Sequence, residues 1–300
     1  MTLLDIYLTG REKLLDRILG IDPMSFLNPE NPQKDSVFAG SALAAKFKGT
    51  IKRFKAIAMN EKGEWVDYQQ LSRNPAYQSF RELVSQLREF DLSTLISQEE
   101  QLAFWINLYN SLVIDAVIQE DIKNSVTESR LGILSFFQKA AYLINGQRFS
   151  LTDIEHGVLR GNRGFPYFPG PHFSATDPRV EVIIRPVDPM IHFALNCASK
   201  SCPPIGVYTA EEVDNQLTLA SRNFIQQDLV IDYDQKTITI SSIFRWYRDD
   251  FGGDKGIVDF LINHIVDHVN QHWLENNRGT VRIKYHTYDW GLNQIKPKVA

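Results

Sequence analysis

The chain has 300 residues, of which 43% are hydrophobic and 23% charged, a balance typical of a globular protein with a large core. The formal net charge is -4, so no overall positive field favours nucleic acid or an anionic membrane surface. Charges interrupt the apolar residues near the N-terminus, and no stretch reaches the ~20 apolar residues of a membrane span. We therefore expect a cytoplasmic protein with no membrane span and no nucleic-acid partner.

The first third of the chain is predicted to be helical. Residues 2–19 have apolar side chains at helical spacing, and Gly20 predicts the end of that helix. The polar run FLNPENPQKDS, with its prolines, indicates a linker. Residues 41–59 contain five basic and no acidic side chains, which we interpret as the solvated face of an amphipathic element rather than a site for phosphates or a lipid headgroup. We place an N-terminal helical extension at residues 1–95 and an α+β core domain at residues 96–300.

A nearly uniform apolar run at residues 102–118 predicts a helix in the middle of the protein. At 100° per residue, its polar exceptions share one sector; they are Asn107, Asn110, Ser111 and Asp115. Polar groups on a buried helix need partners. An internal hydrogen-bond network and the lining of a site are both open interpretations.

A short helix is predicted from Ser150, with Asp153 at the capping position, to a stop at Gly161. On it, His156 and Arg160 are separated by four residues and share a face, and Glu155 lies on an adjacent face. The proline- and glycine-rich segment GNRGFPYFPGPHF follows. It predicts an ordered loop of the kind that often borders a site.

The second half of the chain predicts short strands mixed with helices, without the regular alternation of a doubly wound sheet. We therefore expect a helix-rich, single-domain α+β fold with a small, mainly antiparallel sheet, and a papain- or transglutaminase-like arrangement is one candidate. The expected elements are a strand at 180–184, a helix opened by Thr209 and Glu212, a hairpin at 229–241, helices at 244–251 and 256–273, and a terminal strand within 281–293.

The segment IHFALNCASKSCPPIG contains both cysteines of the chain, Cys197 and Cys202. A cysteine nucleophile needs a base or a positive environment to form a thiolate, and amide donors for the oxyanion. His156, His172 and His192 are candidate bases. Two other interpretations stay open, namely that the cysteines pack as small apolar residues or that they form a local disulfide.

Three histidines, His264, His268 and His272, follow one another at intervals of four residues. Such spacing on one helix can bind a metal, but no glutamate lies between them as in HExxH. They also border an apolar face, where half-buried histidines are common. The two cysteines lack the spacing of a zinc knuckle. We therefore expect no metal and no cofactor.

Five motifs in order resemble those of the domain of unknown function 547 family: FWINLYNSLVIDAVI, DIEHGVLR, HFALNCASKSCPPIG, SSIFRWYRDDF and YDWGLN. They lie between Leu102 and Asn293. The resemblance implies no agreed activity. It does draw attention to polar and reactive residues in otherwise apolar elements, which favours a pocket over an exposed docking surface.

These observations support two hypotheses of function. In the first, the protein is a thiol-dependent hydrolase or acyl/peptidyl transferase acting on a small molecule or peptide. Its candidate catalytic residues are Cys197, Cys202, His156, His192 and Glu155, and its candidate ligand contacts are Asn107, Asn110, Arg160, Asn196 and Ser201. In the second, the chain is a non-catalytic protein-interaction or ligand-binding module in which the same side chains attach loops to the core.

Overall fold

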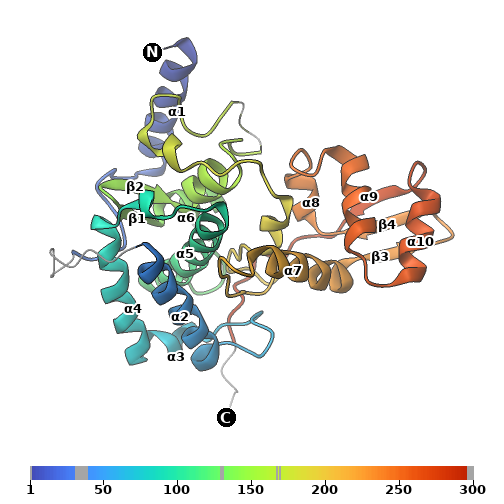
Figure 1. The fold of residues 1–300 in the computed structure, drawn as a ribbon, viewed down its shortest axis with the longest axis horizontal. Coiled ribbons are helices and arrows are strands. Elements are labelled where there is room, and N and C mark those ends of the chain that lie inside the picture. The colour runs from blue at the N-terminus through green and yellow to red at the C-terminus, as the bar shows by residue number, and fades with distance from the viewer. Residues whose placement is uncertain (1, 31–39, 129–131, 167, 169, 296–300) are drawn as a thin grey trace.

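A computed structural model describes residues 2–30, 40–128, 132–166, 168 and 170–295. Part of the predicted linker, residues 31–36, lies outside the described residues. Most helices gather in one body around α5, and the elements from α7 to α10 with β3 and β4 extend to one side of it (Figure 1).

The N-terminal helices form as the sequence predicts. In α1 (Leu3–Leu19), Thr2 and Asp5 form a capping box, and Gly20 ends the helix at a φ of 63°. The helix α2 (Gly40–Ala58) buries Phe47 and Phe54 while most of its basic side chains are exposed. The amphipathic interpretation of this segment is confirmed. Shorter elements follow: α3 (Tyr68–Ser72), α4 (Pro75–Ser85), η1 (Gln86–Glu89) and η2 (Leu92–Thr94).

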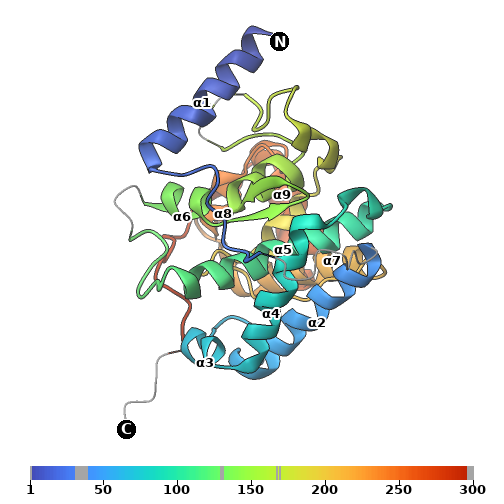
Figure 2. The same ribbon diagram turned by 90° about the vertical axis from the view of Figure 1, so that its left-hand side faces the viewer.

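The helix α5 (Gln98–Gln119) lies at the centre of the helical body, as the turned view in Figure 2 also shows. Ser97 and Glu100 form its capping box, and all of residues 102–117 are buried. It is long and apolar enough to cross a membrane by length and composition, but 89% of its most apolar window is buried inside the protein, as in a core helix. Apolar residues of α2 to α4 share one core with α5. The predicted boundary at residue 95, between an N-terminal extension and a core domain, stays a prediction.

Two small sheets confirm the helix-rich α+β class. After α6 (Ile133–Lys139), β1 (Ala141–Ile144) and β2 (Gln147–Ser150) form an antiparallel hairpin. In the second sheet, β3 (Val230–Asp232) pairs antiparallel with β4 (Thr237–Ile240), which pairs in parallel with β5 (Arg282–Tyr285). The predicted hairpin at 229–241 and the terminal strand are therefore confirmed.

Four helices pack around the second sheet: α7 (Val213–Asp228), α8 (Ser242–Trp246), α9 (Gly253–His264) and α10 (His268–Asn277). They enclose a second, smaller apolar core that includes Phe193, Phe244 and Leu261. The chain therefore has two apolar cores, and the segment that carries the cysteines runs between them.

The strand predicted at 180–184 and the capping box predicted from Thr209 and Glu212 are wrong. Residues 180–184 fall largely in a 3-10 helix, η4 (Pro178–Val182), because Pro178 and the Asp177 cap begin a helical turn. The helix α7 begins after Glu212 without a side-chain cap, and the Thr209 N–H instead donates to Gln216 Oε1 at 2.9 Å. The 3-10 turn η5 (Pro189–Phe193) precedes the cysteine segment.

The predicted helix at 256–273 is divided. Ile265 is extended after α9, and Asp267 caps the start of α10. His264 therefore lies on a different helix from His268 and His272, so the stripe of three histidines does not form. Among the described residues, no group of three side chains of the kinds that bind metals comes together.

Candidate functional site

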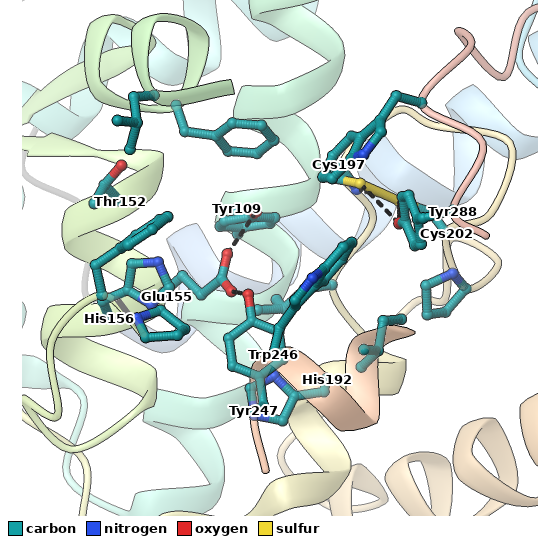
Figure 3. A pocket seen from close by; sticks show the side chains of 18 residues that line it. Tyr109, Thr152, Glu155, His156, His192, Cys197, Cys202, Trp246, Tyr247 and Tyr288 are labelled. Carbon is teal, nitrogen blue, oxygen red and sulfur yellow. Dashed lines mark hydrogen bonds between the residues drawn. A yellow bond between two sulfur atoms is a disulfide. The ribbon is translucent and has the colours of Figure 1, made fainter. Parts of the chain in front are cut away.

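A cavity of about 210 Å³ lies where the two apolar cores meet. Figure 3 shows it with Glu155 and His156 on one side and the two cysteines on the other. The wall consists mainly of aromatic rings, with few polar groups. Its lining residues are Tyr109, Leu134, Phe137, Thr152, Glu155, His156, Phe165, Pro166, His192, Leu195, Cys197, Cys202, Pro203, Ile243, Trp246, Tyr247, Tyr288 and Trp290. We call it the aromatic cavity.

Glu155 and His156 come from η3 (Asp153–Leu159), which is a π-helix. The predicted Ser150 and Asp153 capping pair is confirmed, since each backbone N–H donates to the other side chain. Gly157 is needed inside this helix because an added Cβ would lie 2.2 Å from the Phe173 ring. π-Helical segments are rare and are frequent at functional sites.

The Glu155 carboxylate is buried between two phenols. The Tyr109 hydroxyl donates to Oε2 at 2.9 Å, and the Tyr247 hydroxyl donates to Oε1 (Figure 3). Burial and the nearby carboxylate both raise the pKa of Tyr109 and of Tyr247 well above the ordinary value. Both hydroxyls therefore keep their protons and hold Glu155 in one position.

His156 is arranged as a hydrogen-bond donor. Its Nδ1 lies 2.9 Å from Arg160 Nη1, as the i, i+4 spacing predicts. Arginine offers only donors, so Nδ1 must accept and the neutral ring carries its proton on Nε2. Burial, together with the charge of Arg160, holds the pKa of His156 well below its ordinary value. Near neutral pH the ring is uncharged.

Asp250 connects Arg160 to His192 behind the cavity wall. It accepts from Arg160 at 2.5 and 3.1 Å and from His192 Nε2 at 2.9 Å. Burial alone would raise the pKa of Asp250, but His192 and Arg160 outweigh it and hold that pKa below the ordinary value. The His192 ring stacks on Tyr247 with centroids 3.8 Å apart. Through this stack the network holds the Tyr247 ring, whose hydroxyl donates to Glu155.

Cys197 and Cys202 form a disulfide with Cα atoms 6.2 Å apart, a usual separation. The sequence left three interpretations of the cysteines open, and the structure agrees with the local disulfide. Both sulfurs lie close to the Tyr288 hydroxyl, at 3.3 and 3.2 Å, and to Ser199 Oγ. Within the described chain, no hydrogen bond joins either sulfur to a histidine. As a disulfide the pair offers no thiolate nucleophile.

The predicted asparagines attach loops to α5 and lie outside the described lining of the cavity. Asn107 accepts from the Tyr208 N–H at 3.1 Å and donates to the Tyr208 carbonyl at 2.7 Å. Asn110 donates to the Ala194 carbonyl and accepts from the Asn196 N–H, each at 2.9 Å. The two asparagines therefore supply hydrogen bonds to the backbone of two segments, the one at Tyr208 and the one that leads into Cys197.

The structure thus brings five predicted residues together at the aromatic cavity: Glu155, His156, His192, Cys197 and Cys202. Arg160 contacts the cavity through His156. The Asn196 amide donates to the Pro203 carbonyl at 2.7 Å, and Ser201 Oγ accepts from the Asp289 N–H at 2.9 Å. His172 pairs instead with Asp153, at 2.7 Å.

Several residues of the site were not singled out from the sequence. They are Tyr109, Trp246, Tyr247, Tyr288 and Asp250. Each lies within or beside one of the quoted motifs FWINLYN, SSIFRWYRDDF and YDWGLN. An aromatic residue inside such a motif was the available signal, but buried rings are also ordinary core residues, so the pattern did not distinguish the two roles.

Comparison with known proteins gives one family match. No curated protein and no solved structure matches the chain. The model of the family described as "Protein of unknown function, DUF547" matches residues 93–225. This range includes α5, the π-helix and both cysteines, while α8 and the segment around Tyr288 follow it. Residues 93–225 therefore match the DUF547 family, which confirms the resemblance for the three sequence motifs within that range.

Proposed function

We propose that the aromatic cavity binds a small molecule with an apolar body and a protonated amine. The single observation that carries this proposal is the position of Glu155, a carboxylate held by two tyrosines in a wall of aromatic rings. No lysine or arginine is among the described residues that line the cavity. A cationic group would therefore find a negative partner among the lining residues, while Arg160 lies behind His156 and Tyr247 and is already paired with Asp250.

The physical basis is twofold. A charge-assisted hydrogen bond from an amine to Glu155 would be stronger than a neutral one at this mainly apolar wall. The rings of Trp246 and Trp290, which line the cavity, attract a cation through their ring quadrupoles, an effect of roughly 0.5–2 kcal/mol per contact. The volume of about 210 Å³ suits a small molecule rather than a folded partner.

Tryptophan fluorescence offers a direct test, because Trp246 and Trp290 are two of the five tryptophans of the chain. The protein is titrated with a series of arylalkyl amines and with the uncharged alcohols of the same skeletons. We expect the amines to bind at least about tenfold more tightly, since charge-assisted hydrogen bonds are about twice as strong as neutral ones.

The matched variants are Glu155→Gln at the site and Glu61→Gln on the surface, where Glu61 is exposed. Glu155→Gln should remove the preference for amines, and Glu61→Gln should leave it unchanged. Equal binding of amines and alcohols by the wild-type protein, or an unchanged preference in Glu155→Gln, overturns the proposal.

A second candidate function is thiol-dependent hydrolysis or acyl/peptidyl transfer. It is favoured by one observation, that both sulfurs line the same cavity as Glu155 and His156. Once a reductant has opened the disulfide, a cysteine thiolate could attack an acyl carbonyl. The leaving group would depart with a proton from solvent, and water or an amine would then take the acyl group from sulfur. In this reaction His156 Nε2–H would donate to the oxyanion.

Mass spectrometry tests acyl transfer separately from amine binding. The reduced protein is mixed with activated aryl esters, and an acyl adduct on Cys197 or Cys202 is expected, with none on the oxidised protein. The variants Cys197→Ser and Cys202→Ser identify the sulfur. Failure of the reduced protein to form any adduct, while it still binds ligands, excludes the acyl-transfer candidate and leaves the binding function intact.

A further inference from the structure

The disulfide separates two cavities. Cys197 and Cys202 both line the aromatic cavity, and Cys202 with Tyr288 also lines a second cavity of about 340 Å³. The second cavity lies between the segment around Lys200 and residues of α7 and α8. Both cysteines are partly exposed. Cys197 can therefore be reached from one cavity, and Cys202 faces both.

The loop between the cysteines is held by contacts that do not involve sulfur. The side-chain amide of Asn196 donates to the Pro203 carbonyl at 2.7 Å. This hydrogen bond joins the residues on either side of the disulfide loop. The Ala198 N–H donates to Asn196 Oδ1 at 2.9 Å, and the Lys200 N–H donates to the Gly291 carbonyl at 2.9 Å. These bonds would keep the loop in place after the disulfide opens.

A disulfide of this span also contributes little through chain entropy. The cysteines are five residues apart, and the stabilisation in the chain-entropy model grows with the length of the closed loop. The protein has two apolar cores besides. The disulfide therefore contributes little to the stability of the fold.

The surroundings of Cys202 suit a leaving thiolate. Its sulfur accepts from the Cys197 N–H at 2.9 Å and lies 3.2 Å from the hydroxyls of both Ser199 and Tyr288. Ser199 donates to the Tyr288 oxygen at 3.0 Å, so the Tyr288 proton is left for a sulfur. Hydrogen bonds to a thiolate stabilise it, and a stabilised thiolate leaves faster in exchange reactions.

We propose that Cys197–Cys202 is a redox-active disulfide that oxidises a small organic dithiol entering the aromatic cavity. One thiolate of the dithiol attacks Cys197 Sγ; a sulfur–sulfur bond forms there, and the Cys197–Cys202 bond breaks with its electron pair on Cys202. The second thiolate of the substrate then attacks its own sulfur in the mixed disulfide and displaces Cys197. The substrate leaves as a cyclic disulfide, and its two protons are taken up by the two cysteines.

The first test is a redox titration of the intact chain. The protein is equilibrated with glutathione buffers of increasing reducing strength, quenched with an alkylating reagent and weighed by mass spectrometry. We expect both thiols to appear together, within the range of these buffers and with the fold retained by circular dichroism. A disulfide that stays closed in the most reducing buffer and opens only on unfolding overturns the proposal, as does a folded protein that never forms it.

The second test assigns the roles of the sulfurs with dithiothreitol as the dithiol. Cys202→Ser incubated with glutathione disulfide should form a mixed disulfide on Cys197 faster than Cys197→Ser forms one on Cys202. Tyr288→Phe should slow the reduction of the wild-type disulfide by at least about threefold and shift its pH profile upward, since the leaving thiolate loses a donor. Tyr233→Phe, an exposed control, should change neither.

Equal rates for the two serine variants, or an unchanged pH profile in Tyr288→Phe, contradict the assigned roles. These measurements need no amine ligand. The redox proposal and the amine-binding proposal can therefore fail independently of each other.

Discussion

The ring of Tyr247 lies flat on the imidazole of His192, with centroids 3.8 Å apart and an interplanar angle of 13°. The hydroxyl of the same tyrosine donates to Glu155, and His192 in turn is held by Asp250 at 2.9 Å. One aromatic stack thus connects the buried charge network to the carboxylate of the aromatic cavity. The position of Glu155 depends on residues almost a hundred positions away in the sequence.

Tyr247→Phe should test this connection, because it removes the hydroxyl and keeps the stack. Glu155 loses one of its two phenol donors, and a hydrogen bond to a charged group is worth about 1.5–3 kcal/mol. We expect the free energy of unfolding in urea to fall by that amount. Tyr233→Phe, which removes an exposed hydroxyl bonded to Asn270, should cost less than about 0.5 kcal/mol. An equal decrease in the free energy of unfolding in the two variants would argue against a stabilising hydrogen bond from Tyr247 to Glu155.

Arg160 and Arg163 both pair with Asp250, but only the first is buried. The side chain of Arg160 is 4% exposed and that of Arg163 is 45% exposed. Arg160→Met should cost about 3–5 kcal/mol because it removes the buried partner of Asp250. Arg163→Met should cost less than about 1 kcal/mol because an exposed pair is screened by solvent. Urea denaturation of both variants measures the difference, and a larger loss for Arg163→Met would refute it.

The buried histidines should make stability depend on pH below neutrality. Burial holds the pKa of His156 and of His192 below the ordinary value of 6.5. As the pH falls through 6.5, the unfolded chain takes up protons that the folded chain resists. The free energy of unfolding should therefore decrease between pH 7 and about pH 5, by at most about 1.4 kcal/mol per pH unit for each such histidine.

The control for this pH dependence is a pair of variants. His156→Gln should flatten the slope between pH 7 and about pH 5, and His272→Gln, whose side chain is 77% exposed, should leave it unchanged. A second decrease is expected below about pH 4, where Asp153 and Asp250, whose pKa values are held low, must take up protons. A slope unchanged by His156→Gln would show that another group titrates in this range.

Asn110→Ala should destabilise the cysteine segment. The variant leaves the Ala194 carbonyl and the Asn196 N–H without their partner, and unsatisfied buried groups cost about 1–3 kcal/mol each. We expect a lower melting temperature and faster hydrogen exchange at the Asn196 amide. Asn215→Ala, on the exposed face of α7, should change neither. Unchanged exchange at Asn196 would mean that Asn110 does not hold this segment.

Much of the architecture is readable from local patterns. The helices α1 and α5 follow from hydrophobic periodicity and from capping boxes at Thr2 and Ser97, and the hairpin β3–β4 follows from alternation around a turn. These features depend on neighbours within a few positions. The failures at 180–184 and at Ile265 are of another kind, since a proline turn and an extended residue interrupt segments whose composition otherwise suits a strand and a helix.

The sequence by itself determined the class of fold, the family resemblance over residues 93–225, and the residues Glu155, His156 and Arg160 as a local group, because four-residue spacing already places the last two within reach. It left open whether Cys197 and Cys202 are paired. Only the tertiary structure decided that Asn107 and Asn110 attach loops, and that Tyr109, Tyr247 and Tyr288 complete the site. Hydrogen bonds between residues far apart in the chain depend on the packing of both cores, and no local pattern specifies that packing.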